Sequence, residues 1–153
     1  MTLKETLSHF AGRAFFDRPG RKLSLGEHAA ELRRSGEEIR ARLARAPGSE
    51  KQRAALRHVI GIEKWGQSRL RVFLGDAFVS AGHRVHLPPE GTPWTELVRE
   101  FDETRAETVE IADRLAAETP SRTVSHNQFG ELSPHGWLRY VNGHAHRELR
   151  GLR

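Results

Sequence analysis

Hydrophobic residues recur every three or four positions in two segments of the first half of the chain. This spacing predicts amphipathic helices over residues 24–46 and 49–75. Each segment opens with a capping box, Ser-x-x-Glu at Ser24 and Ser-x-x-Gln at Ser49, which satisfies free N–H groups of the first helical turn. Pro47 and Gly48 separate the two segments, so we expect consecutive helices joined by a short turn.

The second half of the chain shows the same apolar spacing over residues 92–119 and 133–152. In each segment a proline, Pro93 or Pro134, lies in the first turn, where its missing N–H costs no helical hydrogen bond. These segments predict a third and a fourth helix.

Three further segments connect or precede the helices. Residues 1–13 predict a short leading helix with Leu3, Leu7 and Phe10 on one side, residues 76–91 a long crossover loop, and residues 119–132 a short hairpin or turn. Strand patterns are otherwise poor. We therefore expect an all-α fold, a four-helix bundle with a long crossover loop, formed by residues 1–153 as a single domain.

Composition limits the chemistry. The chain of 153 residues contains no cysteine, so a bound metal must be held by His, Asp, Glu or water. No apolar run approaches the about 18 residues of a membrane span, and the N-terminus lacks the apolar segment of a secretion signal. We expect no membrane partner and a cytoplasmic protein.

The chain carries a net charge of +5 and has a pI of about 10.4, which raises the hypothesis of nucleic-acid binding. The arginines alternate with Glu and Asp along residues 31–45 and 96–114, as on solvated helix faces. No aromatic residues interleave with basic ones to stack on bases. We therefore do not expect nucleic acid to be a partner.

The candidate chemistry lies in the second and fourth predicted helices. His144 and Glu148 are four residues apart and so share a helix face. His58 shares its face with the apolar Ile62 and Trp65, which predicts that its ring points inward. Two histidines and one carboxylate, with positions left for water, form a known arrangement for a divalent metal. We predict His58, His144 and Glu148 as ligands, with Zn or Ni favoured and Fe or Mn as alternatives.

Simpler interpretations remain open. An inward histidine is often a hydrogen-bonded core residue, and His144 with Glu148 can form an ordinary surface pair. His146 is two residues from His144, so it is expected to face elsewhere and to be exposed. No metal-binding spacing links five other histidines, which are His28, His83, His86, His126 and His135.

Two stretches carry a family resemblance: residues 57–70, beginning Arg-His-Val-Ile-Gly-Ile-Glu, and residues 129–144, from Phe-Gly-Glu-Leu-Ser to His144. They resemble the DinB-like superfamily of small four-helix bundles, which includes the YfiT-like proteins and is distinct from the DNA polymerase of similar name. The segment from Trp94 to Leu115 is similar to the third helix of that family. The resemblance covers about residues 50–153.

The resemblance implies a metal held by one histidine of the second helix, here His58, and by a His-x-x-x-His pair of the last helix. This chain departs at the third position, where Glu148 replaces the histidine. The resemblance also implies an activity on a small-molecule substrate, either as a metal-dependent hydrolase or as a transferase that uses a low-molecular-weight thiol. It further implies a homodimer. The alternative is a non-catalytic stress-related or small-ligand-binding bundle with a degenerate site.

Other residues have narrower expectations. Trp65 and Tyr140 are expected either to line a pocket beside the metal or to pack in the core. Glu63 lies about 140° around the helix from His58, so it is not expected to be a ligand. Arg69 returns to the face of His58 and is expected to pair with a Glu or Asp or to bind an anionic substrate.

Overall fold

The computed structural model describes residues 2–152, and its four longest helices match the four predicted segments. They are α3 (Leu25–Arg45), α4 (Glu50–Phe73), α5 (Trp94–Glu118) and α6 (Pro134–Glu148). Both capping boxes are confirmed: the Ser24 and Ser49 hydroxyls accept the N3 N–H, and the side chains of Glu27 and Gln52 accept the serine N–H. The sequence placed the other ends less well. Pro93 rather than Thr92 is the N-cap of α5, and α6 stops at Glu148 although apolar spacing continues to Leu152.

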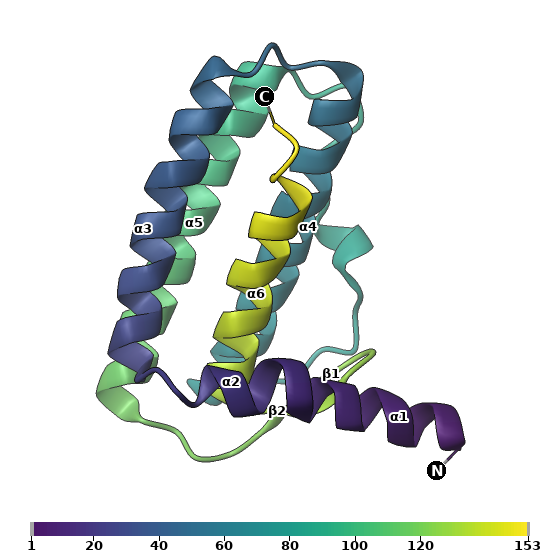
Figure 1. Ribbon diagram of the computed structural model, residues 1–153, viewed down its shortest axis with the longest axis vertical. Coiled ribbons are helices and arrows are strands. Elements are labelled where there is room, and N and C mark those ends of the chain that lie inside the picture. The colour runs from purple at the N-terminus through teal and green to yellow at the C-terminus, as the bar shows by residue number, and fades with distance from the viewer. Residues whose placement is uncertain (1, 153) are drawn as a thin grey trace.

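The four long helices lie side by side (Figure 1). Helix α3 packs against α5 and α6, and α4 also packs against α5 and α6, so the helices close a ring around a shared interior. Their apolar faces meet there in two clusters. One surrounds Trp65 and Trp137 at the end near the hairpin, and the other surrounds Phe101 and Leu56 at the opposite end. The expected all-α class is therefore confirmed.

The N-terminal segment crosses one end of the long helices (Figure 1). It consists of α1 (Leu3–Gly12), a π-helical turn η1 (Arg13–Asp17) and α2 (Arg18–Gly20). The predicted leading helix thus exists from Leu3, residue 1 lies outside the described residues, and helical structure extends beyond residue 13. The side chains of Leu3, Leu7 and Phe10 are largely exposed, at 78%, 60% and 69%.

The two remaining connections carry short elements. Between α4 and α5 the crossover contains a 3-10 helix, η2 (His83–His86), which packs against α4. Before α6, strands β1 (Val124–His126) and β2 (Gly130–Leu132) pair antiparallel, which confirms the expected hairpin. Within residues 2–152, no helix has both the length and the apolar character to cross a membrane.

Candidate metal centre

Helices α4 and α6 approach closely because Gly66 has no side chain. A Cβ built on Gly66 would lie 2.5 Å from Cγ2 of Val141 on α6. One face of α4 therefore packs directly on α6, and this contact brings together the two histidines predicted from sequence. The ring centroids of His58 and His144 are 5.0 Å apart.

This ring spacing fits a shared ion. Two imidazoles that bind one metal through bonds of about 2.1 Å at angles of roughly 90–110° have centroids about 4.6–5.3 Å apart. His58 and His144 lie within that range, and their planes are inclined at 60°. The two residues therefore have the spacing of metal ligands, and they come from different helices as expected.

The two rings open onto a cavity of about 350 Å³. Trp65 and Tyr140 line it, and both side chains also pack in the core, so the two expected placements occur together. Burial raises the pKa of Tyr140 to about 12, which keeps its phenol protonated at neutral pH. The cavity wall is thus uncharged on this side.

His144 is buried and electrostatically suited to remain neutral. Its burial, followed by the charges of His58, Arg147 and His83, lowers its pKa to about 3. Its Nδ1 has no hydrogen-bond partner within residues 2–152. A buried nitrogen without a partner costs about 1–3 kcal/mol, and a neutral imidazole is the form that binds metal. Both features are consistent with a ligand position.

The predicted third ligand is less well placed. Oε1 of Glu148 lies 4.0 Å from Nε2 of His144, and its side chain is 44% exposed at the end of α6. Two donors on one ion, with bonds of about 2.1 Å and tetrahedral angles, lie about 3.4 Å apart. Across the described residues, no three His, Asp or Glu side chains are arranged to hold a metal ion. The ring spacing and the donor types fit a metal, whereas the donor atoms require side-chain rotation to converge.

Sequence analysis missed two further histidines at this cavity. His83, from η2, has its ring centroid 5.2 Å from that of His58, and His126, from β1, has its centroid 4.5 Å from that of Tyr140. Both line the same cavity. Burial, followed by the charge of His58, lowers the pKa of His83. Neither histidine has a periodic relation to His58, because one lies in a crossover and the other in a hairpin, so sequence spacing carries no signal for them.

Glu63 is not at the cavity, as expected. It is 1% exposed and accepts two hydrogen bonds from Arg105, from Nε at 2.7 Å and from Nη2 at 2.9 Å. The Arg105 Nη1 group also donates to Ser35 of α3, and Thr108 donates to Glu63. This network joins α3, α4 and α5. The buried charges of Glu63 and Arg105 therefore have a structural role.

The expected pairing of Arg69 with a carboxylate was wrong. Its Nη2 donates to the Ala81 carbonyl at 3.1 Å and to Oδ1 of Asn127 at 2.8 Å, and no carboxylate pairs with it in the described part of the chain. The guanidinium also lies over the ring of Phe78, 4.2 Å from its centroid. Arg69 therefore ties the crossover and the hairpin to α4. The reason is spatial, since α4 is covered at this turn by loop backbone and not by an acidic helix face.

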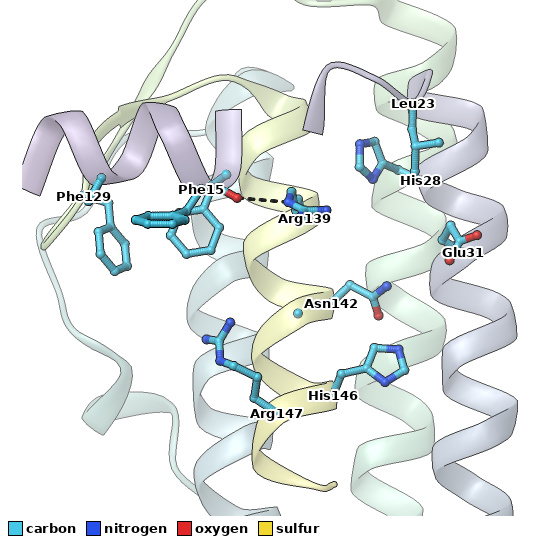
Figure 2. Close-up of a pocket in the computed structure, with 12 residues that line it drawn as sticks. Phe15, Leu23, His28, Glu31, Phe129, Arg139, Asn142, His146 and Arg147 are labelled. Atoms are coloured by element: carbon cyan, nitrogen blue, oxygen red, sulfur yellow. Dashed lines mark hydrogen bonds between the residues drawn. The ribbon is translucent and has the colours of Figure 1, made fainter. Parts of the chain in front are cut away.

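A second cavity of about 570 Å³ lies on the other flank of α6, under the N-terminal segment (Figure 2). Its wall is mostly apolar near Phe15 and Phe129, and Arg139 is held there by donating to the Phe15 carbonyl at 3.0 Å. His146 lines this cavity and is half-buried, which corrects the expectation that it is exposed. Arg147 and Phe129 line both cavities, so the two share a border.

Comparisons of this chain with family models, with curated proteins and with solved structures found no match. The geometry of the cavity therefore carries the functional argument.

Proposed function

We propose that this protein is a divalent-metal-dependent enzyme that acts on a small substrate, with His58, His144 and Glu148 as its ligands. The observation that carries the proposal is the 5.0 Å spacing of two imidazole rings, contributed by two helices, at a shared cavity. The side-by-side arrangement of α3 to α6 supports a four-helix bundle of the DinB-like type, which the sequence resembles. Two imidazole ligands favour Zn or Ni, and the carboxylate widens the choice to Fe or Mn.

A divalent ion in this position would supply a Lewis acid that polarises a substrate carbonyl or lowers the pKa of water or of a thiol. The chain contributes the surrounding wall. Trp65 and Tyr140 form its apolar part, and the Trp65 indole donates to the Ala81 carbonyl at 2.8 Å, which fixes its ring. Hydrolysis and transfer to a low-molecular-weight thiol are both compatible with such a site.

Arg147 favours a substrate that carries a negative charge. It lies at the border of the two cavities, where its guanidinium can pair with a carboxylate or another anion while the apolar part of the substrate enters the larger cavity beside Phe15. Figure 2 shows Arg147 on the flank of α6 that faces Phe15 and Phe129. A small anionic substrate with an apolar portion is the class that this lining favours.

Metal analysis of the purified protein tests the proposal. We expect about one Zn or Ni ion per chain after reconstitution, and a large loss in His58→Ala and His144→Ala. His135→Ala is the matched control, because His135 is partly buried on α6 but does not line the cavity. Less than about 0.2 ion per wild-type chain would contradict the proposal, since a closed ligand set binds one ion per site.

A second candidate function is a non-catalytic stress-related or small-ligand-binding protein with a degenerate metal site. The exposure of the Glu148 side chain and its position at the end of α6 favour it. It predicts that screens for hydrolysis and thiol transfer stay blank and that His58→Ala leaves ligand binding unchanged. We further propose a cytoplasmic homodimer, without nucleic acid as a partner.

A further inference from the structure

The Asn127 side chain is held in one orientation by Arg69. Nη2 of Arg69 donates to Oδ1 of Asn127 at 2.8 Å and to the Ala81 carbonyl at 3.1 Å, and Arg69 is only 1% exposed. A guanidinium can only donate, so the carboxamide must turn its oxygen toward Arg69. Asn127 lines the cavity of about 350 Å³ at the hairpin. The polar atom that it offers to a ligand there is therefore Nδ2, which donates to no other group among residues 2–152.

Tyr140 offers a second donor to the same cavity. It is 7% exposed, and its hydroxyl makes no hydrogen bond in the described part of the chain. The oxygen is nevertheless not sealed from solvent, and the residue lines the cavity. Burial raises the pKa of Tyr140 to about 12, so the hydroxyl keeps its proton at neutral pH. The Tyr140 ring lies 6.1 Å from that of His144 and 4.5 Å from that of His126, measured between centroids.

The rest of the wall supplies few acceptors. None of the residues that line the cavity is Asp or Glu. The Trp65 indole N–H is already used by the Ala81 carbonyl, and Arg147 adds a guanidinium, which can only donate. Apart from the histidine ring nitrogens and the exposed amide of Gln128, the free side-chain groups of this wall are donors. A ligand with acceptor oxygens and a negative charge matches them.

We propose that Asn127 and Tyr140 determine substrate specificity, and that Nδ2 and the phenolic hydroxyl donate hydrogen bonds to a small carboxylate. This inference rests on the proposed function, because it takes the cavity as the substrate site. A carboxylate only accepts, and its two oxygens accept about four hydrogen bonds. Arg147 supplies the opposite charge. A ligand that presents an ammonium group instead is rejected, because donors then face donors and stay unpaired.

Titration of the metal-free full-length protein with benzoate and with benzylamine tests the inference. The two probes share an aromatic ring but carry an acceptor group and a donor group, respectively. Chemical shifts of the Trp65 indole N–H and of the Asn127 side-chain amide report binding at this cavity. We expect the wild type to bind benzoate at least about tenfold more tightly than benzylamine, as for other sites that discriminate by hydrogen bonding.

Three variants separate the two donors from the charge of Arg147. Asn127→Ala, Asn127→Asp and Tyr140→Phe should each weaken benzoate binding at least about fivefold, the loss of one hydrogen bond to a charged group. Asn127→Asp keeps an acceptor for Arg69 and replaces only Nδ2 by an oxygen, so a purely structural role of Asn127 predicts unchanged binding. Asn142→Asp is the matched control. Asn142 also accepts through Oδ1, from Ser35 at 2.6 Å, but it lines the other cavity.

The possible results separate this inference from the proposed function. Equal affinity of the wild type for both probes, or no benzoate binding at about 10 mM, overturns the inference. It is also wrong if any of the three variants binds benzoate like the wild type, or if Asn142→Asp weakens binding as much as Asn127→Asp. A protein that selects benzoate as expected but binds no metal contradicts the proposed function alone. A protein that binds one ion per chain without selecting benzoate contradicts the inference alone.

Discussion

At the scale of single residues, His126 shows how a hairpin fixes the state of a ring. Its Nδ1 accepts hydrogen bonds from the backbone N–H groups of Gln128 and Phe129, at 3.0 and 3.2 Å. Since those groups can only donate, Nδ1 carries no proton and the neutral ring is protonated at Nε2. Burial, followed by the charge of Arg69, lowers the pKa of His126 to about 4. The ring is therefore a neutral acceptor that closes the turn between β1 and β2.

We predict that this histidine makes the protein less stable in acid. Its folded pKa of about 4 lies below the ordinary value of 6.5, so the unfolded chain binds more protons between these values. The free energy of unfolding should therefore be fully retained above pH 6.5. It should fall as the pH drops toward 4, by up to about 1.4 kcal/mol per pH unit from this one ring. Urea unfolding at several pH values measures the slope.

His126→Asn is the matched variant for that measurement. An asparagine side chain can accept the N–H two residues on, as in an Asx turn, but it does not titrate. The variant should be less stable overall because a buried ring is lost, yet its stability should depend less steeply on pH than that of the wild type. Equal slopes would show that His126 does not cause the effect.

Sequence reasoning worked at this scale where a helix carried the residue. The separation of Glu63 from His58 follows from the helical period, and the structure agrees. The same period directs His58 toward the interior, and the structure places it half-buried at the cavity. The position of His83 at the cavity could not be predicted in the same way, because a crossover has no helical period. Its path depends on contacts with Trp65, Arg57 and Gly61 of α4. The partners of Arg69 were missed for a related reason, since they are loop atoms that spacing does not reveal.

At the scale of elements, the contact between α4 and α6 sets the distance between His58 and His144. Gly66→Ala places a methyl group where Cγ2 of Val141 lies at 2.5 Å, so one helix must shift. We expect a loss of about 1–3 kcal/mol in the free energy of unfolding, as for other overpacked contacts. We also expect weaker Zn²⁺ binding, because the His58 and His144 rings would move apart. Urea unfolding and Zn²⁺ titration measure the two effects.

Gly26→Ala provides the control for this variant. Gly26 is also a helical glycine, but the nearest atom to a Cβ placed there is the Ser24 hydroxyl oxygen at 3.9 Å. Alanine has a higher helix propensity, so this change should stabilise the protein by at most about 1 kcal/mol. Equal changes in the free energy of unfolding for the two alanine variants would show that the close packing of α4 on α6 does not require a glycine at position 66.

The buried pair of Glu63 and Arg105 ties three helices together. Glu63→Gln leaves the Arg105 guanidinium, whose side chain is 5% exposed, without its counterion. We expect a destabilisation of about 3–5 kcal/mol, typical of breaking a buried pair on one side. Asp113→Asn tests the contrast, since its pair with Arg33 is about half exposed and should contribute less than about 1 kcal/mol. Similar urea midpoints for the two variants would contradict this structural role.

At the scale of the whole molecule, the sequence predicted the helices and the all-α class because each helix carries its own start signals and apolar face. It did not predict how the helices close their ring. That arrangement depends on small residues such as Gly66, whose role appears only once its neighbour Val141 on α6 is known. The candidate site is therefore readable in sequence only to the extent that its ligands lie on long helices.

The final prediction concerns assembly. Leu3, Leu7 and Phe10 recur on one side of α1 and are 78%, 60% and 69% exposed, so this helix leaves an apolar stripe in water. In the homodimer proposed above, burying this stripe against a second copy would remove it from water. We expect light scattering to give twice the 17.3 kDa mass of one chain.

Leu7→Glu should yield monomers, since a charge in the buried stripe is costly. Val85→Glu, at a residue that is 73% exposed on η2, should leave the dimer intact. A wild-type mass of one chain, or a Leu7→Glu protein that remains dimeric, would rule out this interface.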